Sequence, residues 1–298
     1  MGTLDGRVAV VTGAGAGLGR AHALLLAAEG ARLVVNDLRN AKEVAEEIAA
    51  AGGQAVPVDG DVADLSVGRQ IVDAAVESFG DLHVVVNNAG FIRDALIVNM
   101  TEEQFDAILA VHLKGTFAVT KAAAVYWRDQ AKQGATADRS VINTTSGAGL
   151  HGNAGQFNYS AAKAGSAMMA VTLAAELKRF NVRANAVAPV AATAPVLSTP
   201  GIGEMIGSAQ AVDGFDRFDP ANTSPLVGYL ATAGCRFTGQ VFSVYGGHVG
   251  LYRGWSIEHR VDQDRRWTVA ELGDALAGFP AHVKTNRQRI EIPKGAGA

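Results

Sequence analysis

Short runs rich in Val, Ala and Leu alternate along this chain with segments whose apolar residues recur at helical spacing. The short runs are almost continuously apolar, as in strands of a parallel sheet that is buried on both faces. We interpret the following runs as strands: Val8–Val11, Leu33–Asn36, Ala55–Val58, Val84–Asn87, Val141–Thr145, Ala184–Ala188 and Val241–Tyr245. Helical spacing predicts helices over Leu18–Glu29, Ala41–Ala51, Val67–Phe79 and Thr101–Arg128.

This alternation predicts an α/β fold in which one doubly wound, seven-stranded parallel sheet forms a single domain over residues 1–250. Thr101 and Gln104 have the spacing of a capping box, which would start the fourth helix. Two stretches break the rhythm. Val190–Phe218 is predicted to be a long loop with one short helix, of the length often found in functional lids. Residues 251–298 are predicted to be an extension folded onto the same domain, with a mobile tail.

Composition narrows the class of protein without naming a reaction. The 298 residues are 48% hydrophobic and 18% charged, as in a soluble globular protein, and the net charge of −3 implies no partner nucleic acid. Cys235 is the only cysteine, which excludes an internal disulfide and a multi-cysteine zinc site, and no metal site is expected. No uninterrupted apolar run approaches a membrane span of ~20 residues. With neither a signal peptide nor a peroxisomal address visible, we expect a cytoplasmic enzyme.

A glycine-rich turn, Thr12–Gly19, follows the first predicted strand and opens the first predicted helix. Backbone N–H groups at a helix N-terminus bind pyrophosphate well, and glycines let the ligand approach closely. Asp37 ends the next strand, where a carboxylate can bond ribose hydroxyls and repel a 2′-phosphate. Because Ala16 and Leu38 provide no cation for such a phosphate, NAD is favoured, although Arg39 lies close by. Tight packing of the glycines and an Asp that merely ends a strand are the alternatives.

Tyr159 and Lys163 lie four residues apart, so a helix would place them one turn apart on the same face. A phenol with its reference pKa of about 10 is a poor acid or base at neutral pH, but a neighbouring cation can lower such a pKa by roughly 1–3 units. The pair by itself is weak, because many helices carry a buried aromatic residue beside a solvated lysine.

Together these motifs resemble the short-chain dehydrogenase/reductase family over about residues 5–250. The motifs are Thr12-Gly13-x-x-x-Gly17-x-Gly19, Asn87-Asn88-Ala89-Gly90, and Tyr159-x-x-x-Lys163 with Ser146 thirteen residues before the tyrosine. The resemblance implies a Rossmann-type fold. Further strings, such as Val111–Gly115 and His151–Gln156, are similar to the dehydrogenase part of peroxisomal multifunctional enzyme type 2 and its stand-alone bacterial relatives.

The resemblance implies a role for each reaction residue. Tyr159 would exchange a proton with the substrate oxygen, Lys163 would lower the pKa of Tyr159 and hold the nicotinamide ribose, and Ser146 would bond the substrate oxygen. His112 stands where most of the family has an Asn that anchors a proton-relaying water. It would take over that relay or be a buried histidine bonded to backbone, and the sequence leaves both open. Gln156 is a candidate substrate contact, although such loop residues are usually solvated.

The cofactor contacts are also carried over by resemblance. They are Gly13, Gly17, Leu18, Gly19, Asp37, Asp61, Val62, Asn88, Ala89, Gly90, Tyr159, Lys163, Pro189 and Thr193. Pro189-Val190 departs from the family's Pro-Gly, which puts the grip on the nicotinamide carboxamide in doubt.

The predicted function is an NAD-dependent oxidoreductase that interconverts a secondary alcohol and a ketone on a (3R)-hydroxyacyl-CoA or a 17β-hydroxysteroid. An NADPH-dependent 3-oxoacyl carrier-protein reductase is one alternative, against which Asp37 argues. A non-catalytic dinucleotide-binding protein is another, against which the intact Ser146, Tyr159 and Lys163 argue. The resemblance further implies a homodimer or homotetramer built on the helices around Thr101–Arg128 and Tyr159–Phe180.

Overall fold

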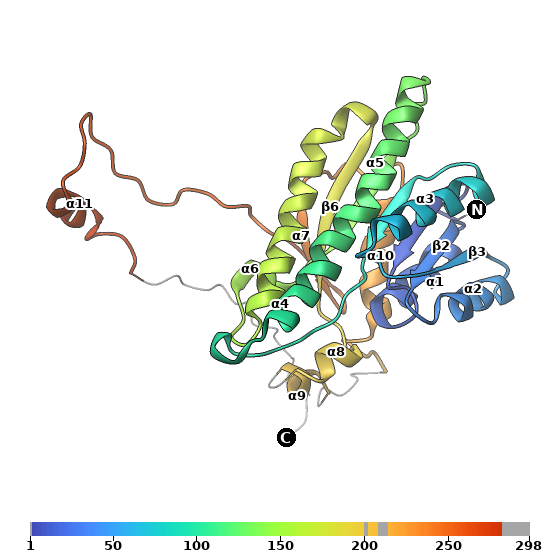
Figure 1. Ribbon diagram of the computed structural model, residues 1–298, viewed down its shortest axis with the longest axis horizontal. Helices are drawn as coiled ribbons and strands as arrows, with labels where there is room; N and C mark the ends of the chain where they lie inside the picture. The colour runs from blue at the N-terminus through green and yellow to red at the C-terminus, as the bar shows by residue number, and fades with distance from the viewer. Residues whose placement is uncertain (1, 200–201, 208–213, 282–298) are drawn as a thin grey trace. The chain divides into compact units, whose positions relative to one another are not determined.

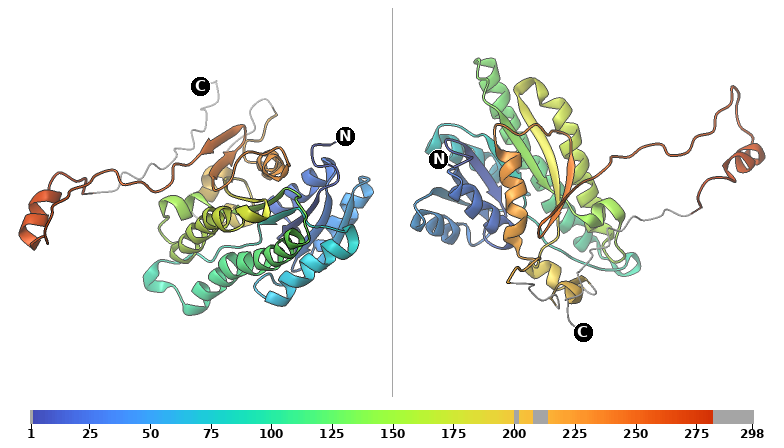
Figure 2. Two further views of the ribbon diagram at one scale, coloured as in Figure 1. Left: turned by 90° about the horizontal axis from the view of Figure 1, so that it is seen from above. Right: turned by 180° about the vertical axis from the view of Figure 1, so that it is seen from behind.

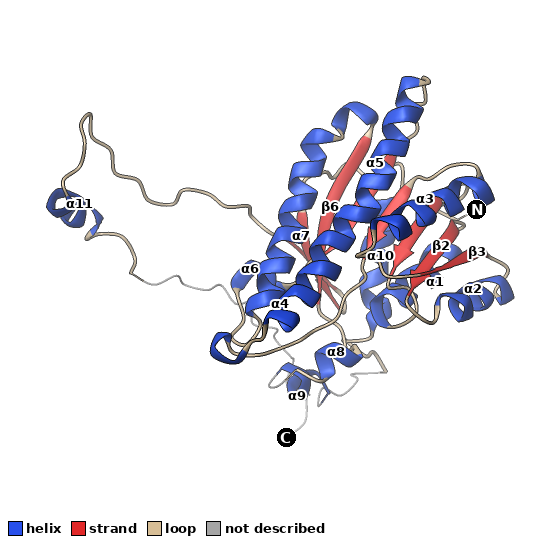
Figure 3. Ribbon diagram, in the orientation of Figure 1, coloured by secondary structure: helices blue, strands red, loops and turns tan. Residues whose placement is uncertain are grey.

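The computed structural model describes residues 2–199, 202–207 and 214–281, and within them eight strands form one sheet (Figure 1; Figure 3). The strands are β1 Val8–Thr12, β2 Arg32–Asp37, β3 Gln54–Asp59, β4 Val84–Asn87, β5 Arg139–Thr144, β6 Val182–Pro189, β7 Val241–Tyr245 and β8 His248–Leu251. Their order in the sheet is β3-β2-β1-β4-β5-β6-β7-β8. The strands β1 to β7 pair in parallel, and β8 pairs antiparallel with β7.

Helices connect the parallel strands. They are α1 Gly17–Ala28, α2 Ala41–Ala50, α3 Leu65–Phe79, α4 Glu102–Leu109, α5 Thr116–Lys132, α6 Gly147–His151, α7 Phe157–Glu176, α8 Ala194–Leu197, α9 Ile202–Gly207, α10 Ser224–Ala231 and α11 Val269–Leu276. A π-helical segment, Ala110–Gly115, joins α4 to α5, and short 3-10 turns lie at Ile97–Asn99, Lys178–Phe180 and Pro220–Thr223.

Alternate residues of the central strands supply two separate hydrophobic cores, one on each face of the sheet. Ala9 and Val11 of β1 belong to the core that contains buried residues of α1, α2 and α10. Val8 and Val10 belong to the core that contains α3, α5 and the end of α7. Figure 2 shows these two helical layers from above and from behind. Since both faces are covered, the strands can be apolar throughout, which is why they were recognisable as continuous runs.

The predicted doubly wound α/β sheet and its seven parallel strands are confirmed, as is the capping box of Thr101 and Gln104. The count of seven was one short, because His248–Leu251 returns antiparallel along the sheet edge. The tight turn at Gly246, with φ of 50°, reverses the chain, and most of β8 is exposed, so it lacks the buried apolar pattern. The loop Val190–Phe218 contains two short helices among its described residues, α8 and α9, where one was predicted.

The chain divides after Tyr252 into the sheet unit and a second, smaller unit that begins at Arg253. The described part of the second unit is mainly irregular and contains α11, whose N-terminus is capped by Thr268 and Glu271. Arg265 pairs with the same glutamate. The boundary lies two residues beyond the predicted residue 250. Packing of the extension on the sheet domain stays a prediction. The mobile tail predicted at its end falls within residues 282–298, which lie outside the described residues.

One continuous helical stretch in the described part of the chain, Glu102–Lys132, is long and apolar enough to cross a membrane by length and composition alone. The prediction from sequence looked for an uninterrupted apolar run, which Lys114 and Lys121 prevent here. Of the most apolar part of this stretch, 44% is buried within the protein. Val119, Ala123 and Trp127 on it belong to the core beneath α3, as expected for a core helix.

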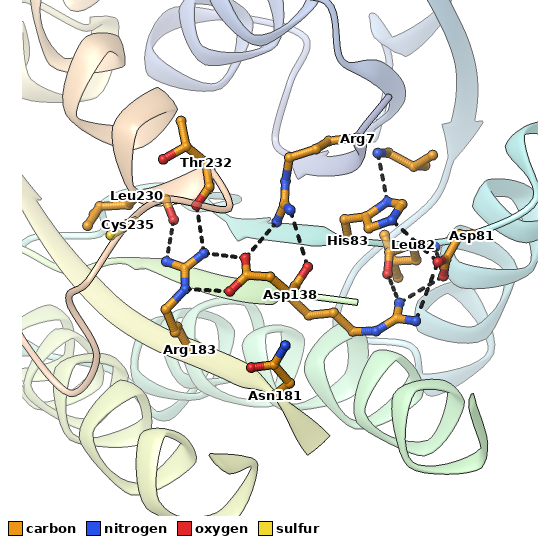
Figure 4. A network of polar contacts seen from close by, with 12 residues as sticks. Arg7, Asp81, Leu82, His83, Asp138, Asn181, Arg183, Leu230, Thr232 and Cys235 are labelled. Atoms are coloured by element: carbon orange, nitrogen blue, oxygen red, sulfur yellow. Dashed lines mark hydrogen bonds and ion pairs between the residues drawn. The ribbon is translucent and has the colours of Figure 1, made fainter. Parts of the chain in front are cut away.

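A network of ion pairs ties together the amino ends of the strands (Figure 4). Asp138, just before β5, accepts hydrogen bonds from Arg183 at 2.6 and 3.0 Å and pairs with Arg7 at 3.4 Å. Arg183 also donates to the carbonyl oxygens of Leu230 and Thr232, which end α10. One carboxylate therefore joins β1, β5, β6 and α10 at the edge of the sheet opposite to the carboxyl ends of the strands.

Replacing Asp138 by Asn should lower the free energy of unfolding by about 2–4 kcal/mol, because it leaves two largely buried guanidinium groups facing each other without a carboxylate. Urea denaturation measures this loss. The matched control is Asp129→Asn, which breaks an exposed pair with Arg128 and should leave stability nearly unchanged. Equal stabilities of the two variants would contradict the structural role of Asp138.

Candidate active site

A cavity of about 420 Å³ lies at the carboxyl ends of the parallel strands. It spans the point between β1 and β4 where the strand order reverses, the usual ligand crevice of doubly wound sheets. Most residues predicted for the site line it: Gly13, Gly17, Leu18, Asp37, Asp61, Val62, Asn88, Ala89, Gly90, His112, Ser146, Tyr159, Lys163, Pro189 and Thr193. Gly19 and Gln156 are the predicted residues that do not.

The floor of the cavity is a joint between the turns after β1 and β4. The Thr12 hydroxyl accepts hydrogen bonds from the backbone N–H groups of Asn88 and Ala89, at 3.0 and 3.1 Å. The Asn88 amide donates back to the carbonyl oxygens of Thr12 and Gly13. A Cβ on Gly13 would meet the Ala89 backbone, and one on Gly19 would overlap the Gly13 carbonyl. Gly19 thus permits close packing, and its predicted contact with the cofactor stays a prediction.

The glycine turn has the features of a pyrophosphate site. Gly13 and Gly17 have φ of 63° and 53°, a region that favours glycine. Ala16 is the N-cap of α1, and no side chain caps the helix there, so its first N–H groups point toward the cavity without a side-chain acceptor. A phosphate group would supply the missing acceptors.

Asp37 ends β2 at the rim of the same cavity. Its carboxylate accepts from the backbone N–H groups of Gly15 at 2.9 Å and Arg39 at 3.2 Å. A Cβ on Gly15 would lie 2.8 Å from the Asp37 carboxyl carbon, so this glycine is required for the approach. Leu38 beside it is 66% exposed. Together, the glycine turn, the uncapped helix and this carboxylate fit a nicotinamide dinucleotide.

Tyr159 and Ser146 come together at the inner end of the cavity. Ser146 caps α6, accepting a hydrogen bond from the Ala148 N–H at 3.2 Å. The Ser146 side chain is also close enough to the Tyr159 phenol, in the first turn of α7, to lower the pKa of that phenol. Burial raises the pKa of Tyr159 to about 12, the Ser146 side chain acts in the opposite direction, and the Asp94 carboxylate raises this pKa further. A substrate oxygen placed against both hydroxyls would meet two hydrogen-bond donors.

Lys163 is fully enclosed behind Tyr159, with 4% of its surface exposed. Its ammonium group donates to the Thr144 carbonyl at 2.7 Å and lies 5.7 Å from the Tyr159 ring centre. Burial lowers the pKa of Lys163 to about 7. Burial shifts both groups toward their neutral forms, because desolvation disfavours the charged form of each, and the expected lowering of the Tyr159 pKa by Lys163 stays a prediction.

His112 lies in the π-helical segment, and its ring meets the Tyr159 ring edge-on at 5.2 Å. Nε2 lies 2.8 Å from the Phe91 carbonyl oxygen and 3.3 Å from the Phe91 backbone nitrogen, so this ring nitrogen bonds the backbone in either tautomer. Nδ1 is buried without a partner among the described residues. Burial lowers the pKa of His112 to about 3, which keeps the ring neutral. Both readings from the sequence hold in part: one nitrogen bonds backbone, and the other is available to a water.

Gly90 is required by this histidine. A Cβ on Gly90 would overlap the His112 ring at Cε1 and lie 2.7 Å from Nδ1. In this chain, the third position of the Asn88-Ala89-Gly90 motif thus has no room for a side chain beside the His112 ring.

The cavity wall also includes apolar residues from the segments after β4 and β6. They are Phe91, Ile92, Ala191, Ala194, Pro195 and Val196. Gln156 lies outside this wall and is 5% exposed, with its amide bonded to Asp94 and Asn153. The sequence predicted a Gln156 that is solvated or faces the substrate, whereas the structure buries this side chain away from the cavity. Sequence reasoning missed Asp94 and Asn158, although both are polar residues beside recognised motifs.

The comparisons with known proteins agree with this geometry. The family model described as short chain dehydrogenase matches residues 7–199. The chain therefore belongs to the short-chain dehydrogenase family, whose members are oxidoreductases acting on CH–OH groups.

Among curated relatives, hydroxyacyl-CoA dehydrogenase ChsB1 of Mycobacterium tuberculosis is 42% identical over 287 residues, which cover 93% of this chain and 89% of the relative. Peroxisomal multifunctional enzyme type 2 of Drosophila melanogaster is 41% identical over 246 residues, which cover 79% of this chain and 38% of that longer protein. A crystal structure of a short chain dehydrogenase from Mycobacterium avium matches with a TM-score of 0.83 and 46% identity, over 93% of this chain and 95% of the other.

Proposed function

We propose that this chain is an NAD-dependent dehydrogenase that interconverts the secondary alcohol and the ketone of a (3R)-hydroxyacyl-CoA. The observation that carries the reaction type is the Ser146–Tyr159 pair at the closed end of the cavity, with Lys163 behind it. The apolar wall next to this pair suits an acyl chain. The relative named hydroxyacyl-CoA dehydrogenase, which aligns over nearly the whole chain, supports the substrate class.

In the oxidation direction, the substrate hydroxyl would lie between the two side-chain oxygens of Ser146 and Tyr159. Tyr159, in its phenolate form after its own proton has passed on to Lys163, takes the proton of that hydroxyl, and Ser146 donates a hydrogen bond to the oxygen as carbonyl character develops. The nicotinamide ring, when bound, supplies the hydride chemistry. In the reduction direction Tyr159 returns the proton to the oxygen.

Lys163 and His112 would handle the proton once Tyr159 holds it. The pKa of Lys163, about 7, lies near a working pH at which the group can both accept and release a proton. The Nδ1 of His112 has no partner among the described residues and can bond a water, since the other ring nitrogen is held by the Phe91 backbone. We therefore propose that His112 takes the place of the family's Asn in orienting that water.

Replacing Tyr159 by Phe should lower kcat/KM by about 10²–10⁴-fold or more, because only the proton-exchanging oxygen is lost. The assay follows NADH formation with a series of (3R)-hydroxyacyl-CoA esters beside 17β-hydroxysteroids. NADH binding, followed by its fluorescence, should persist in the variant. The matched control is Tyr229→Phe, since Tyr229 is a half-exposed residue on α10.

Retained turnover in the Tyr159 variant would contradict the assignment. Activity restricted to the hydroxysteroids would replace the acyl-CoA by the steroid predicted as the other substrate class. No turnover of any secondary alcohol, together with tight NADH binding, would favour the non-catalytic alternative.

For the cofactor, we propose NAD over NADP because Asp37 places a negative charge at the ribose rim and the exposed Leu38 beside it provides no cation. Asp37→Ser should weaken NADH binding and strengthen NADPH binding, each by about tenfold, since it removes a charge-assisted hydrogen bond and a repulsion. Fluorescence titration measures both affinities. Asp59→Ser is the control, because Asp59 ends the neighbouring strand β3 in register with Asp37 but does not line the cavity.

A wild-type protein that prefers NADPH would contradict this choice. It would also revive the 3-oxoacyl carrier-protein reductase, the alternative function that the sequence left open.

We further propose a homodimer in which α5 and α7 pack against a second copy. The support is a set of exposed apolar side chains on these two helices, each 38–48% exposed: Phe117, Val125, Met168 and Val171. Met168→Glu should then yield a monomer in sedimentation velocity at micromolar concentration, whereas a monomeric wild-type protein would contradict the proposal. The cytoplasmic location stays a prediction.

A further inference from the structure

The segment Phe91–Ala95 is fastened to the start of α7 by groups that take no part in the mechanism above. Asn158 donates to the carbonyl oxygens of Arg93 and Gln104, at 3.1 and 3.0 Å. The Ala95 N–H donates to the Gly155 carbonyl at 2.8 Å, and Ala95 forms a parallel bridge with Gln156. The wall residues Phe91 and Ile92 are thus held against the helix that carries Tyr159.

A carboxylate and an amide complete this joint. The Gln156 Nε2 group donates to both oxygens of Asp94, each at 3.1 Å. Its Oε1 accepts from Asn153 at 3.0 Å, which fixes the orientation of the amide. Gln156 is the N-cap residue of α7, three positions before Tyr159. Asn158, which is fully buried, accepts from the Tyr159 N–H at 2.7 Å. The phenol therefore stands on a turn whose polar groups are bonded to the Asp94 segment.

Asp94 also brings a negative charge to this place. Burial raises the pKa of its carboxyl group, and the Gln156 hydrogen bond lowers it. The neighbouring guanidinium of Arg93 lies over the Phe91 ring at 5.1 Å and donates to the Ile92 carbonyl. Among the described residues, the ion pairs of the structure do not include Asp94.

The other polar groups around Tyr159 differ from Asp94 in their charge and in their effect on the pKa of the phenol. Ser146 from the cap of α6 lowers the pKa of the phenol, and Asp94 raises it. His112 from the π-helical segment is neutral at any working pH, since its pKa is about 3. Lys163 from α7 is the cation of the site, and it donates to Thr144. Asp94 is thus the group with negative charge that acts on the phenol.

We propose that Asp94 is a positioning residue of the proton-transfer site, which fixes the first turn of α7, and with it the Tyr159 phenol, through its two hydrogen bonds from Gln156. This inference rests on the proposed role of Tyr159. The Asp94 charge also favours the protonated phenol, the form that delivers a proton to a carbonyl oxygen. Removal of the Asp94 charge alone should make Tyr159 a stronger acid, while the side chains of the site stay in place.

The test compares the pH dependence of alcohol oxidation in the wild type and in Asp94→Asn, which keeps the shape and an acceptor for Gln156. The pH at which kcat/KM reaches half its plateau should fall by about one unit, as expected for the loss of one nearby charge at intermediate dielectric. Gln156→Met keeps the charge but removes the bond, and should lower kcat about tenfold with a smaller shift in the profile. Asp106→Asn, on the exposed side of α4, is the matched control for charge and should leave the profile unchanged.

A second measurement does not need turnover. The tyrosinate absorbance of each protein, minus that of the same protein carrying Tyr159→Phe, gives the titration of this one phenol. The same downward shift is expected there even if every substrate fails, which separates this inference from the proposed function.

A profile and a phenol titration that stay unmoved in Asp94→Asn would overturn the proposal, whatever happens to kcat, because Asp94 would then be only structural. Asp94→Ser removes the same charge if the Asn variant does not fold. Failure of both to fold, while Asp106→Asn folds, would equally overturn the electrostatic role.

Discussion

The close approach of two backbone turns, after β1 and after β4, is the constraint on which the rest of the site depends. Thr12 bridges them by accepting from two successive N–H groups, and Gly13 lets the turns approach without a clash. This joint fixes where α1 begins relative to the carboxyl ends of the strands, and it fixes the direction in which the chain continues after Ala89. The pyrophosphate turn on one side and the segment leading to the substrate wall on the other both start from it.

Burial decides the protonation behaviour of the site more than proximity of charges does. Tyr159, Lys163 and His112 are all packed where water is scarce, and burial favours the neutral form of each group. The pKa of Tyr159 is therefore raised, and the pKa values of Lys163 and His112 are lowered. A proton that passes from the neutral phenol to the neutral amine would leave a phenolate and an ammonium group, which stabilise each other as an ion pair in this dry site. In such an environment a single neighbouring charge interacts strongly, because little water screens it. This is why the one carboxylate of Asp94 affects the pKa of the phenol.

The strands and most helices were predictable to within a few residues because burial on both faces of the sheet demands continuous apolar runs between amphipathic helices. Elements without that requirement were missed. The strand β8 is short and mostly exposed, and the predicted helix over Thr101–Arg128 contains an unpredicted π-helical segment, in which His112 is buried. Local sequence patterns carry no signal for either, since the edge pairing and the π-helical segment depend on neighbours distant in the chain.

By itself, the sequence determined which chemical groups are present and at what spacing: the glycine turn, the acid that ends β2, and Ser146, Tyr159 and Lys163. These follow from local geometry, because a strand end, a helix start and one helical turn each place side chains predictably. Only the tertiary structure decided that Gln156 is buried, that it bonds Asp94, and that His112 needs Gly90. It also decided the direction in which the pKa of Tyr159 moves, since desolvation is a property of the packed site and not of a motif.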